Sequence, residues 1–301
     1  MSSVLVVGSM AYDSIETPKG KVEDTLGGSA TYFSAAASLL TPVNVVAVVG
    51  EDFRHDELNF LRIRKVNFDG LQQEKGKTFR WGGRYSEDFN ERETLYTQLN
   101  VFEDFSPQIP PAYKTTPYVF LANIGPQLQQ QVLQQMDTPL FTAMDTMNFW
   151  ISGNYESLLE VIGQVDCLML NDSEARQLVD ESNLVKALQK IAALGPEVVI
   201  VKKGEHGAVM RTQKGLFFAP AFPISEVVDC TGAGDSFAGG FMGYLASTDD
   251  LSENNLRKAM VFGSIVASFC VEDFGIRRLQ SLTLAEIQER YRQFRQLTSV
   301  E

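Results

Sequence analysis

Residues 227–245 read VVDCTGAGDSFAGGFMGYL, with a run of small residues directly before Asp235. Beyond this aspartate, apolar side chains recur at the spacing of an α-helix: Phe237, Phe241, Tyr244 and Leu245. A helix is therefore predicted to begin near residue 235, after a loop. Each glycine inside a helix costs roughly 0.5–1 kcal/mol, so these glycines must serve either a ligand or close packing between helices.

The GAGD turn is the predicted mouth of this helix and comprises Gly232, Ala233, Gly234 and Asp235. Amides in the first turn of a helix lack internal partners and lie at the positive end of the helix dipole, so they bind anions that small side chains admit. A carboxylate beside them can accept the proton of an alcohol while the amides hold the charge of a transferred phosphoryl group. We predict that Asp235 is the general base of such a transfer. The alternative is an aspartate that caps the helix, with small residues that allow close packing.

Apolar, β-branched runs recur along the chain between stretches of helical period. They lie at residues 4–7, 43–49, 118–122, 139–144, 165–170 and 197–201. Strands that are buried on both faces and alternate with helices form parallel sheets with helices on each side. The predicted fold is α/β, a doubly wound, mostly parallel sheet in an α/β/α sandwich, with residues 1–301 as one domain.

Residues 12–26 and 76–103 break this pattern, because polar and apolar residues alternate there between turn signals. Such alternation is typical of short antiparallel strands with one face open to water. We predict that the two segments form a small inserted β lid. Its aromatic residues are expected to cluster, either to cover a sugar or base or to pair with a second lid across a homodimer. They are Phe79, Trp81, Tyr85 and Phe89.

The C-terminal stretch 283–297 predicts a helix on the outside of the sheet. Its first turn contains a capping box formed by Thr283 and Glu286. Its apolar residues recur at steps of three and four: Leu284, Ile287, Tyr291 and Phe294.

Composition excludes several classes of function. The 301 residues contain 38 acidic and 26 basic side chains, a net charge of −12, so nucleic acid and anionic membranes would be repelled. No window reaches the eighteen or so apolar residues of a membrane span, and we expect a cytoplasmic protein. The three cysteines form no CxxC pair and the two histidines lie far apart, which argues against zinc and histidine chemistry.

The stretch DCTGAGDSFAGGF resembles the second signature of the ribokinase (PfkB-type carbohydrate kinase) family. Further resemblance follows in the family's order and spans most of the chain, with GSMAYD at 8–13, GG at 27–28, NDSE at 171–174 and VKKGEHGAV at 201–209. The resemblance implies a kinase that uses ATP and Mg²⁺, with the GAGD turn as anion hole and Asp235 as catalytic base.

The resemblance also implies an acceptor site. Asp13 would bind acceptor hydroxyls, whereas from the residues alone it is a turn-former. Gly27 and Gly28 would serve as hinge and as backbone close to the substrate, or as a tight turn before a helix over 29–40. Asn123 and Asp145 end core strands, where a doubly wound fold places ligand groups, and are further candidates for acceptor binding.

On the nucleotide side, Lys202, Gly204 and Gly207 would contact ATP, although a lysine near a strand end is commonly solvated. Asn171 and Glu174 would organise water bound to Mg²⁺, yet Asn-x-x-Glu after a strand is also a helix capping box. Mg²⁺ usually keeps several waters and few protein ligands. In some members of the family, residues at the positions of Asp229 and Thr231 bind a monovalent cation such as K⁺.

The sequence departs from the family pattern at Tyr32, where asparagine is usual, and at Cys230, where threonine or serine is usual. Tyrosine adds bulk and stacking surface, which fits a ring other than the common furanose, or a nucleoside, and resembles inositol-kinase-like relatives. Tyr32 is therefore a further candidate for substrate binding.

The favoured hypothesis is an ATP-dependent kinase of a sugar, nucleoside or cyclitol hydroxyl. The alternative is a noncatalytic nucleotide or metabolite sensor that retains the fold. A dinucleotide-dependent oxidoreductase lacks its GxGxxG motif after the first strand, and a P-loop ATPase lacks GxxxxGK[ST].

Overall fold

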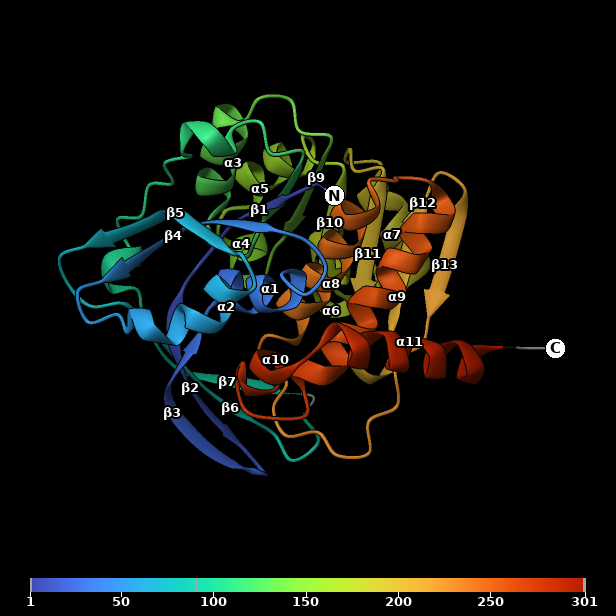
Figure 1. The fold of residues 1–301 in the computed structure, drawn as a ribbon. Helices are drawn as coiled ribbons and strands as arrows, with labels where there is room; N and C mark the ends of the chain where they lie inside the picture. The colour runs from blue at the N-terminus through green and yellow to red at the C-terminus, as the bar shows by residue number, and fades with distance from the viewer. Residues whose placement is uncertain (1, 90, 300–301) are drawn as a thin grey trace.

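The computed structural model describes residues 2–89 and 91–299, and its main body is built around a large sheet (Figure 1). In these residues the sheet has nine strands in the order β13-β12-β11-β10-β9-β8-β1-β4-β5. They are β1 (Val4–Val7), β4 (Val43–Gly50), β5 (Asn67–Glu74), β8 (Tyr118–Leu121), β9 (Phe141–Asp145), β10 (Cys167–Asn171), β11 (Val198–Lys202), β12 (Ala208–Thr212) and β13 (Gly215–Ala219). All neighbouring pairs are parallel except β11–β12 and β12–β13. The predicted mostly parallel, doubly wound sheet is confirmed.

Burial on both faces explains the continuous apolar runs of the central strands. In β1, Val4 and Val6 enter the core on one face, and Leu5 and Val7 enter the core on the other. Three strands, β5, β12 and β13, were not among the predicted runs. Two of them, β5 and β13, lie at the sheet edges and carry exposed polar residues, so their sequences lack the signal of a buried strand.

Helices cover both faces of the sheet. One core contains residues of α1 (Ser29–Ala37), α8 (Ala233–Thr248), α9 (Glu253–Cys270) and α11 (Leu284–Thr298). The other contains residues of α3 (Pro126–Gln135), α4 (Asn148–Gly153), α5 (Tyr155–Ile162), α6 (Asp172–Leu178) and α7 (Leu184–Ala192). Two short helices, α2 (Asn59–Ile63) and α10 (Arg277–Ser281), complete the set among the described residues. Each of these helices is too short or too polar to span a membrane.

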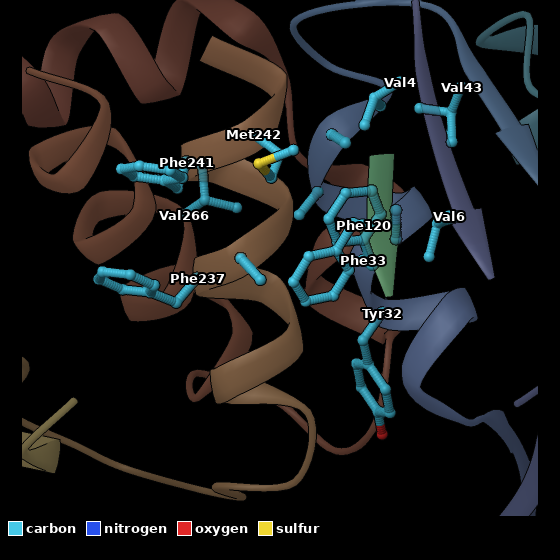
Figure 2. Close-up of a cluster of buried hydrophobic side chains, with 14 of the residues drawn as sticks. Val4, Val6, Tyr32, Phe33, Val43, Phe120, Phe237, Phe241, Met242 and Val266 are labelled. Atoms are coloured by element: carbon cyan, nitrogen blue, oxygen red, sulfur yellow. The ribbon is translucent and has the colours of Figure 1, made fainter. Parts of the chain in front are cut away.

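Close helix packing accounts for some glycines of the opening stretch. A Cβ at Gly239 would lie 2.5 Å from the carbonyl oxygen of Phe33 in α1. A Cβ at Gly240 would lie 2.9 Å from the carbonyl oxygen of Phe262 in α9. Figure 2 shows the core beside these contacts, where Phe33 and Phe120 stack with their ring centroids 4.6 Å apart. The glycines inside α8 are therefore packing residues.

A second, small sheet lies at one end of the main body (Figure 1). Its order is β3-β2-β6-β7, with β2 (Ala11–Thr17), β3 (Gly20–Gly27), β6 (Phe79–Tyr85) and β7 (Arg92–Gln98). The two predicted lid segments thus form one sheet, although β2 and β6 pair in parallel rather than antiparallel. This sheet fits a lid, and we call it the lid sheet.

The predicted cluster of four lid aromatics is wrong. Phe79 stacks on Phe102 at the edge of the main body, with centroids 5.4 Å apart. Tyr85 and Phe89 lie together, with centroids 6.4 Å apart. Trp81 instead contacts Arg92. Alternation along β6 places Phe79, Trp81 and Tyr85 on one face, but a spacing of two residues does not bring rings into contact.

The C-terminal helix α11 begins with the predicted capping box of Thr283 and Glu286. It packs on α9 rather than on the sheet itself, with the rings of Tyr291 and Phe262 5.0 Å apart. Leu284, in the first turn of α11, stays 43% exposed, whereas Ile287 and Phe294 in later turns are buried. The first turn of α11 therefore does not share the packing of the later turns.

Candidate active site

The candidate residues gather at the carboxyl ends of the parallel strands, next to the lid sheet. Asp145, Asn171 and Lys202 are the last residues of β9, β10 and β11. The loop after β1 leads into β2, which carries Asp13. This edge of a doubly wound sheet is where ligands bind, because the loops there leave a crevice.

Asp13 lies directly over the glycine pair. A Cβ at Gly27 would be 2.0 Å from one of its carboxyl oxygens, and Gly28 has a φ of 90°, which favours glycine. Burial raises the pKa of Asp13 to about 7; Gly28 N–H opposes the rise, and Asp229 and Asp235 add to it. The predicted role of Gly27 and Gly28 as backbone close to the substrate stays a prediction, and α1 begins at Ser29 as expected but ends at Ala37 rather than residue 40.

Tyr32 contacts the GAGD turn. An ideal Cβ at Gly232, whose φ is 74°, would lie 2.2 Å from the tyrosine ring, so only glycine fits there. The ring closes one end of the core, and its hydroxyl points away from the other labelled side chains (Figure 2). This hydroxyl is buried and has no hydrogen-bond partner among the described residues. Such a group is costly unless a ligand pairs with it.

The start of α8 has the features of an anion site. The helix begins at Ala233, and no side chain caps it. The amides of Gly234 and Asp235 donate to no main-chain carbonyl in the part of the chain that the structure describes. A Cβ at Gly234 would lie 3.1 Å from Nζ of Lys202, so the lysine amine stands above the turn. Two amides without a main-chain acceptor and one ammonium thus lie beside the half-buried Asp235, whose own amide contributes a hydrogen bond to its carboxyl.

Lys202 is paired rather than solvated. Its Nζ lies 2.6 Å from Oδ2 of Asp145, and the two side chains are 17% and 7% exposed. Burial would lower the pKa of Lys202, but Asp145 and Glu174 raise it more, so the amine stays charged. The open alternative of a solvated lysine is therefore wrong.

Asn171 and Glu174 form the capping box of α6. Oδ1 of Asn171 accepts the Glu174 N–H at 2.8 Å, and the Asn171 N–H donates to Oε2 of Glu174 at 2.7 Å. Burial and the nearby Asp145 raise the pKa of Glu174 to about 7, opposed by Lys202. The capping interpretation is confirmed, and within the box only Oε2 of Glu174 accepts a hydrogen bond.

Asp235 itself has a raised pKa of about 7. The loss of water around the carboxyl is the main cause, Asp145 adds to it, and Lys202 opposes it. A carboxyl with a pKa near neutrality is well suited to accept a proton, since general bases work best near the operating pH.

Asp229 and Thr231 lie behind the turn. The two carboxyl oxygens of Asp229 each accept one backbone N–H at 2.8 Å, from Thr231 and from Gly275. Burial raises the pKa of Asp229, and this carboxyl makes no ion pair with any described residue. A buried carboxylate without a cation is an arrangement that a monovalent cation would stabilise.

Some predicted residues lie elsewhere. The indole N–H of Trp150 in α4 donates a hydrogen bond to Oδ1 of Asn123 at 3.0 Å. The side-chain oxygen of Asn123 therefore already accepts one hydrogen bond within the protein. Gly204 and Gly207 form the hairpin between β11 and β12, where the N–H of Lys203 donates to the Gly207 carbonyl at 2.7 Å. A Cβ at Gly207 would meet Ala219 and Pro220, and a Cβ at Gly204 would meet nothing within 4 Å, so neither glycine touches the GAGD turn.

Sequence reasoning named Tyr85 as a lid aromatic but did not show how the lid sheet meets this site. The hydroxyl groups of Tyr85 and Thr231 lie 3.1 Å apart, which ties β6 to the loop before α8. Arg92 pairs with Tyr85 across β6 and β7. The alternating pattern placed both residues on strands, but it could not show which face of the lid sheet meets the main body.

The residues fit ATP and Mg²⁺ as substrates. Free amides, Lys202 and small side chains suit a polyphosphate. The described residues contain no group of three or more His, Cys, Asp or Glu side chains arranged to hold a metal. Mg²⁺ would therefore be held largely by phosphate oxygens and water, as is usual for this ion.

Residues 1–281 match the model of the pfkB family of carbohydrate kinases. The chain belongs to the PfkB family. It is a kinase of that family, with the ribokinase-like fold. A cytidine kinase from Thermococcus kodakarensis is 27% identical over 250 residues, 80% of this chain and 88% of that protein. A nucleoside kinase from Methanocaldococcus jannaschii is 24% identical over 293 residues, 91% of this chain and 92% of that protein.

Solved PfkB-type structures agree in fold. The crystal structure of the Methanocaldococcus jannaschii nucleoside kinase superposes with a TM-score of 0.78 at 22% identity, covering 97% of this chain and 99% of that chain. Ribokinase from Thermotoga maritima gives 0.77 at 18% identity, covering 97% and 100%. Membership of a kinase family, with the GAGD turn in place, rules against the alternative of a noncatalytic sensor.

Proposed function

We propose that this PfkB-family kinase transfers the terminal phosphoryl group of ATP to a hydroxyl of a small sugar, nucleoside or cyclitol, with Asp235 as general base. The observation that carries the proposal is the position of Asp235: its carboxyl lies in the first turn of α8, beside two amides that donate to no main-chain carbonyl and near the amine of Lys202.

In the proposed step, Asp235 takes the proton of the acceptor hydroxyl as its oxygen forms a bond to phosphorus and the bond to the ADP oxygen breaks. The amides of Gly234 and Asp235 and the ammonium of Lys202 stabilise the charge on the transferred group. Mg²⁺, when bound, neutralises charge on the nucleotide phosphates. Asp13 orients the acceptor through hydrogen bonds to its hydroxyls.

Several features support the remaining assignments. The raised pKa of Glu174 and its place beside Asp145 and Lys202 favour a role near Mg²⁺-bound water. The uncompensated Asp229 favours a monovalent cation beside Thr231, which turnover in K⁺ compared with tetramethylammonium would test. Gly204 and Gly207 are proposed to border the nucleotide. Asn123 is also proposed for acceptor binding, through its side-chain amide N–H groups, since its Oδ1 already accepts the indole N–H of Trp150.

Two observations bear on the acceptor. The two relatives that cover most of the chain are named for nucleoside substrates. Tyr32 is buried and places its hydroxyl beside the GAGD turn and near the carboxyl of Asp13, whose pKa it lowers, so a hydroxyl of a nucleoside or a polyhydroxylated ring could engage it. A screen with ATP and Mg²⁺ against ribose, fructose, cytidine, adenosine, inosine and myo-inositol identifies the acceptor class.

The test of the proposal is Asp235→Asn in the acceptor that the screen selects. Phosphoryl transfer should fall by about 10²–10⁴-fold, because removal of a general base costs that much. Asp104→Asn is the matched control, since Asp104 is exposed and distant from the turn in sequence. Retention of more than a tenth of the wild-type rate by Asp235→Asn would refute the role of the base.

A further inference from the structure

A cavity lies at the edge of the large sheet, away from the GAGD turn. It has a volume of 210 Å³ and is bordered by residues of the edge strand β13 and of the helices α9 and α11 (Figure 1). Helix α9 connects it to the candidate active site. Arg257 in the first half of α9 borders the cavity, whereas the thiol of Cys270 at the end of α9 donates to the Thr231 carbonyl at 3.4 Å. The helix rises by about 20 Å between Arg257 and Cys270, so the cavity is separate from the site of phosphoryl transfer.

Three aromatic side chains line this cavity. Phe217 of β13 and Tyr291 of α11 are partly buried at the rim of the core that contains α9. Phe294 lies three residues after Tyr291, so the two rings share one face of α11. Aromatic faces favour stacking with another planar ring. Pockets for drug-sized ligands have volumes of about 300–1,000 Å³, so this smaller cavity suits a small ring compound.

Three cationic side chains surround these rings: Arg257, Lys258 and Arg295. Arg257 pairs with Glu253 at 2.9 Å, and its guanidinium carbon lies 5.3 Å from the ring centroid of Phe217. Lys258 and Arg295 form no ion pair with any residue in the ranges 2–89 and 91–299. The cavity thus has two cationic groups at its border that no carboxylate of these ranges neutralises.

The charge of the segments that form the cavity is opposite to that of the whole chain. These segments, 213–225, 254–271 and 290–299, contain basic residues and no acidic residue, although the chain has 38 acidic and only 26 basic side chains. Long basic side chains commonly cover apolar surface with their stems, but such coverage does not require that acidic residues be absent. A local positive potential in an acidic protein attracts an anion.

We propose that this cavity is a binding site for a small aromatic anion, a planar ring that carries a carboxylate, sulfonate or phosphate group. The ring enters among Phe217, Tyr291 and Phe294. The anionic group pairs with Lys258 and Arg295, because hydrogen bonds between ionised groups are the strong ones. An aliphatic anion lacks the stacking, and a neutral ring leaves the two cations unpaired. The site is independent of the proposed phosphoryl transfer.

The test uses naphthalene-2-sulfonate as the probe, because it is fluorescent and fully ionised at neutral pH. Fluorescence anisotropy titrations with the full chain measure its affinity. NMR spectra of protein labelled in its valine methyl groups locate the probe, since Val261 borders the cavity and is assigned through Val261→Ile. Wild type should bind the probe with a shift of the Val261 signals, and saturating ADP with Mg²⁺ should not displace it.

The double variant Lys258→Gln with Arg295→Gln should bind the probe about 10-fold or more weakly, because both charge-assisted contacts are lost. Both side chains are exposed, so the variant should fold, which circular dichroism and the melting temperature check. The matched control is Lys186→Gln with Lys190→Gln. It removes the same charge from α7, on the other face of the large sheet, and should stay within about 2-fold of wild type because salt screens distant charges.

A second arm separates the two halves of the ligand. Cyclohexanesulfonate lacks the aromatic ring and 2-naphthalenemethanol lacks the charge, so both should compete with the probe several-fold more weakly than unlabelled naphthalene-1-sulfonate does. Equal competition by the neutral alcohol would show an apolar groove without preference for an anion, and would overturn the proposal.

Other outcomes also overturn it. They are equal probe affinity of wild type and the Lys258/Arg295 variant, no binding at about 1 mM probe, and displacement by ADP, which would place the probe in the active site. An affinity that falls as the protein concentration rises would show that a second copy of the chain covers the cavity instead.

Discussion

Asp235 has a pKa of about 7, raised by loss of water and by Asp145, and this sets the expected pH dependence of the enzyme. A general base must be deprotonated, so kcat/KM should rise with pH through about 7 and level off above about 8. Initial rates at saturating ATP between pH 5.5 and 9 measure the profile. A flat profile from pH 5.5 to 8 would contradict the assignment of Asp235 as the base.

The same carboxyl should reduce stability at high pH. Because its pKa is higher in the folded than in the unfolded protein, its contribution to stability is full below about pH 4 and is lost as the pH rises through about 7. Asp235→Asn should therefore have a higher melting temperature than wild type at pH 8, and the difference should be much smaller at pH 4. Calorimetry at both values decides; an equal difference at both would show that the carboxyl carries no such penalty.

Several residues of the site were predictable because a motif or a strand end marked them. Asp13, the GAGD turn and Lys202 are examples, and the structure brings them together. Arg92 and the link between Tyr85 and Thr231 were not predictable, because they depend on how the lid sheet docks. The contact between Asn123 and the indole of Trp150 was likewise not predictable, and the role of Asn123 in acceptor binding stays a prediction.

The glycines of helix α8 have two functions, space at the candidate site and close packing against neighbouring helices. Gly232 and Gly234 lie at the turn under Tyr32 and Lys202, and Gly239 lies against α1. The glycines therefore serve both predicted purposes. Gly232 and Gly234 leave room at the site, and the later glycines of α8 allow close contact between helices. Periodicity in the sequence could predict the helix but not its neighbours.

Gly239→Ala should destabilise the protein by about 1–3 kcal/mol, because its Cβ would lie 2.5 Å from the Phe33 carbonyl oxygen and 2.8 Å from Cβ of Ala36. Urea unfolding measures the change. Gly153→Ala is the matched control, since a Cβ at this exposed end of α4 would meet nothing within 4 Å, and it should leave stability unchanged or slightly higher. Equal effects of the two substitutions would disprove close packing between α8 and α1.

Most of the large sheet was predictable because its central strands are buried on both faces and therefore apolar throughout. The edge strands β5 and β13 were not predicted, because many of their residues are exposed and their apolar pattern is weak. The C-terminal helix α11 was predicted together with its capping box. Its packing against α9 was not predicted, because an apolar stripe on a helix can pack against another helix as well as against a sheet.

The edge strand β7 of the lid sheet has features that favour association with another chain. Every residue of β7 is exposed, and Leu95 and Tyr96 are 42% and 36% exposed. A cavity of 320 Å³ borders both, between β2, β3 and the β6–β7 hairpin. Unpaired edges and apolar side chains favour association, so we propose a homodimer through the lid sheet.

Sedimentation velocity at micromolar concentrations should detect this dimer, and Leu95→Lys with Tyr96→Lys should convert it to a monomer. Phe218→Lys is the control, since Phe218 is 61% exposed at the opposite edge of the molecule in β13. A concentration of about 100 μM is high enough to populate a weak dimer. Wild-type protein that sediments as a monomer at this concentration would rule out the lid interface.

The most direct measurement is a crystal structure of the protein with ADP, Mg²⁺ and aluminium fluoride. We predict that the fluoride group accepts hydrogen bonds from the amides of Gly234 and Asp235 and that the carboxylate of Asp235 faces its acceptor side. A fluoride group bound away from the start of α8, or a carboxylate of Asp235 turned from it, would contradict the account.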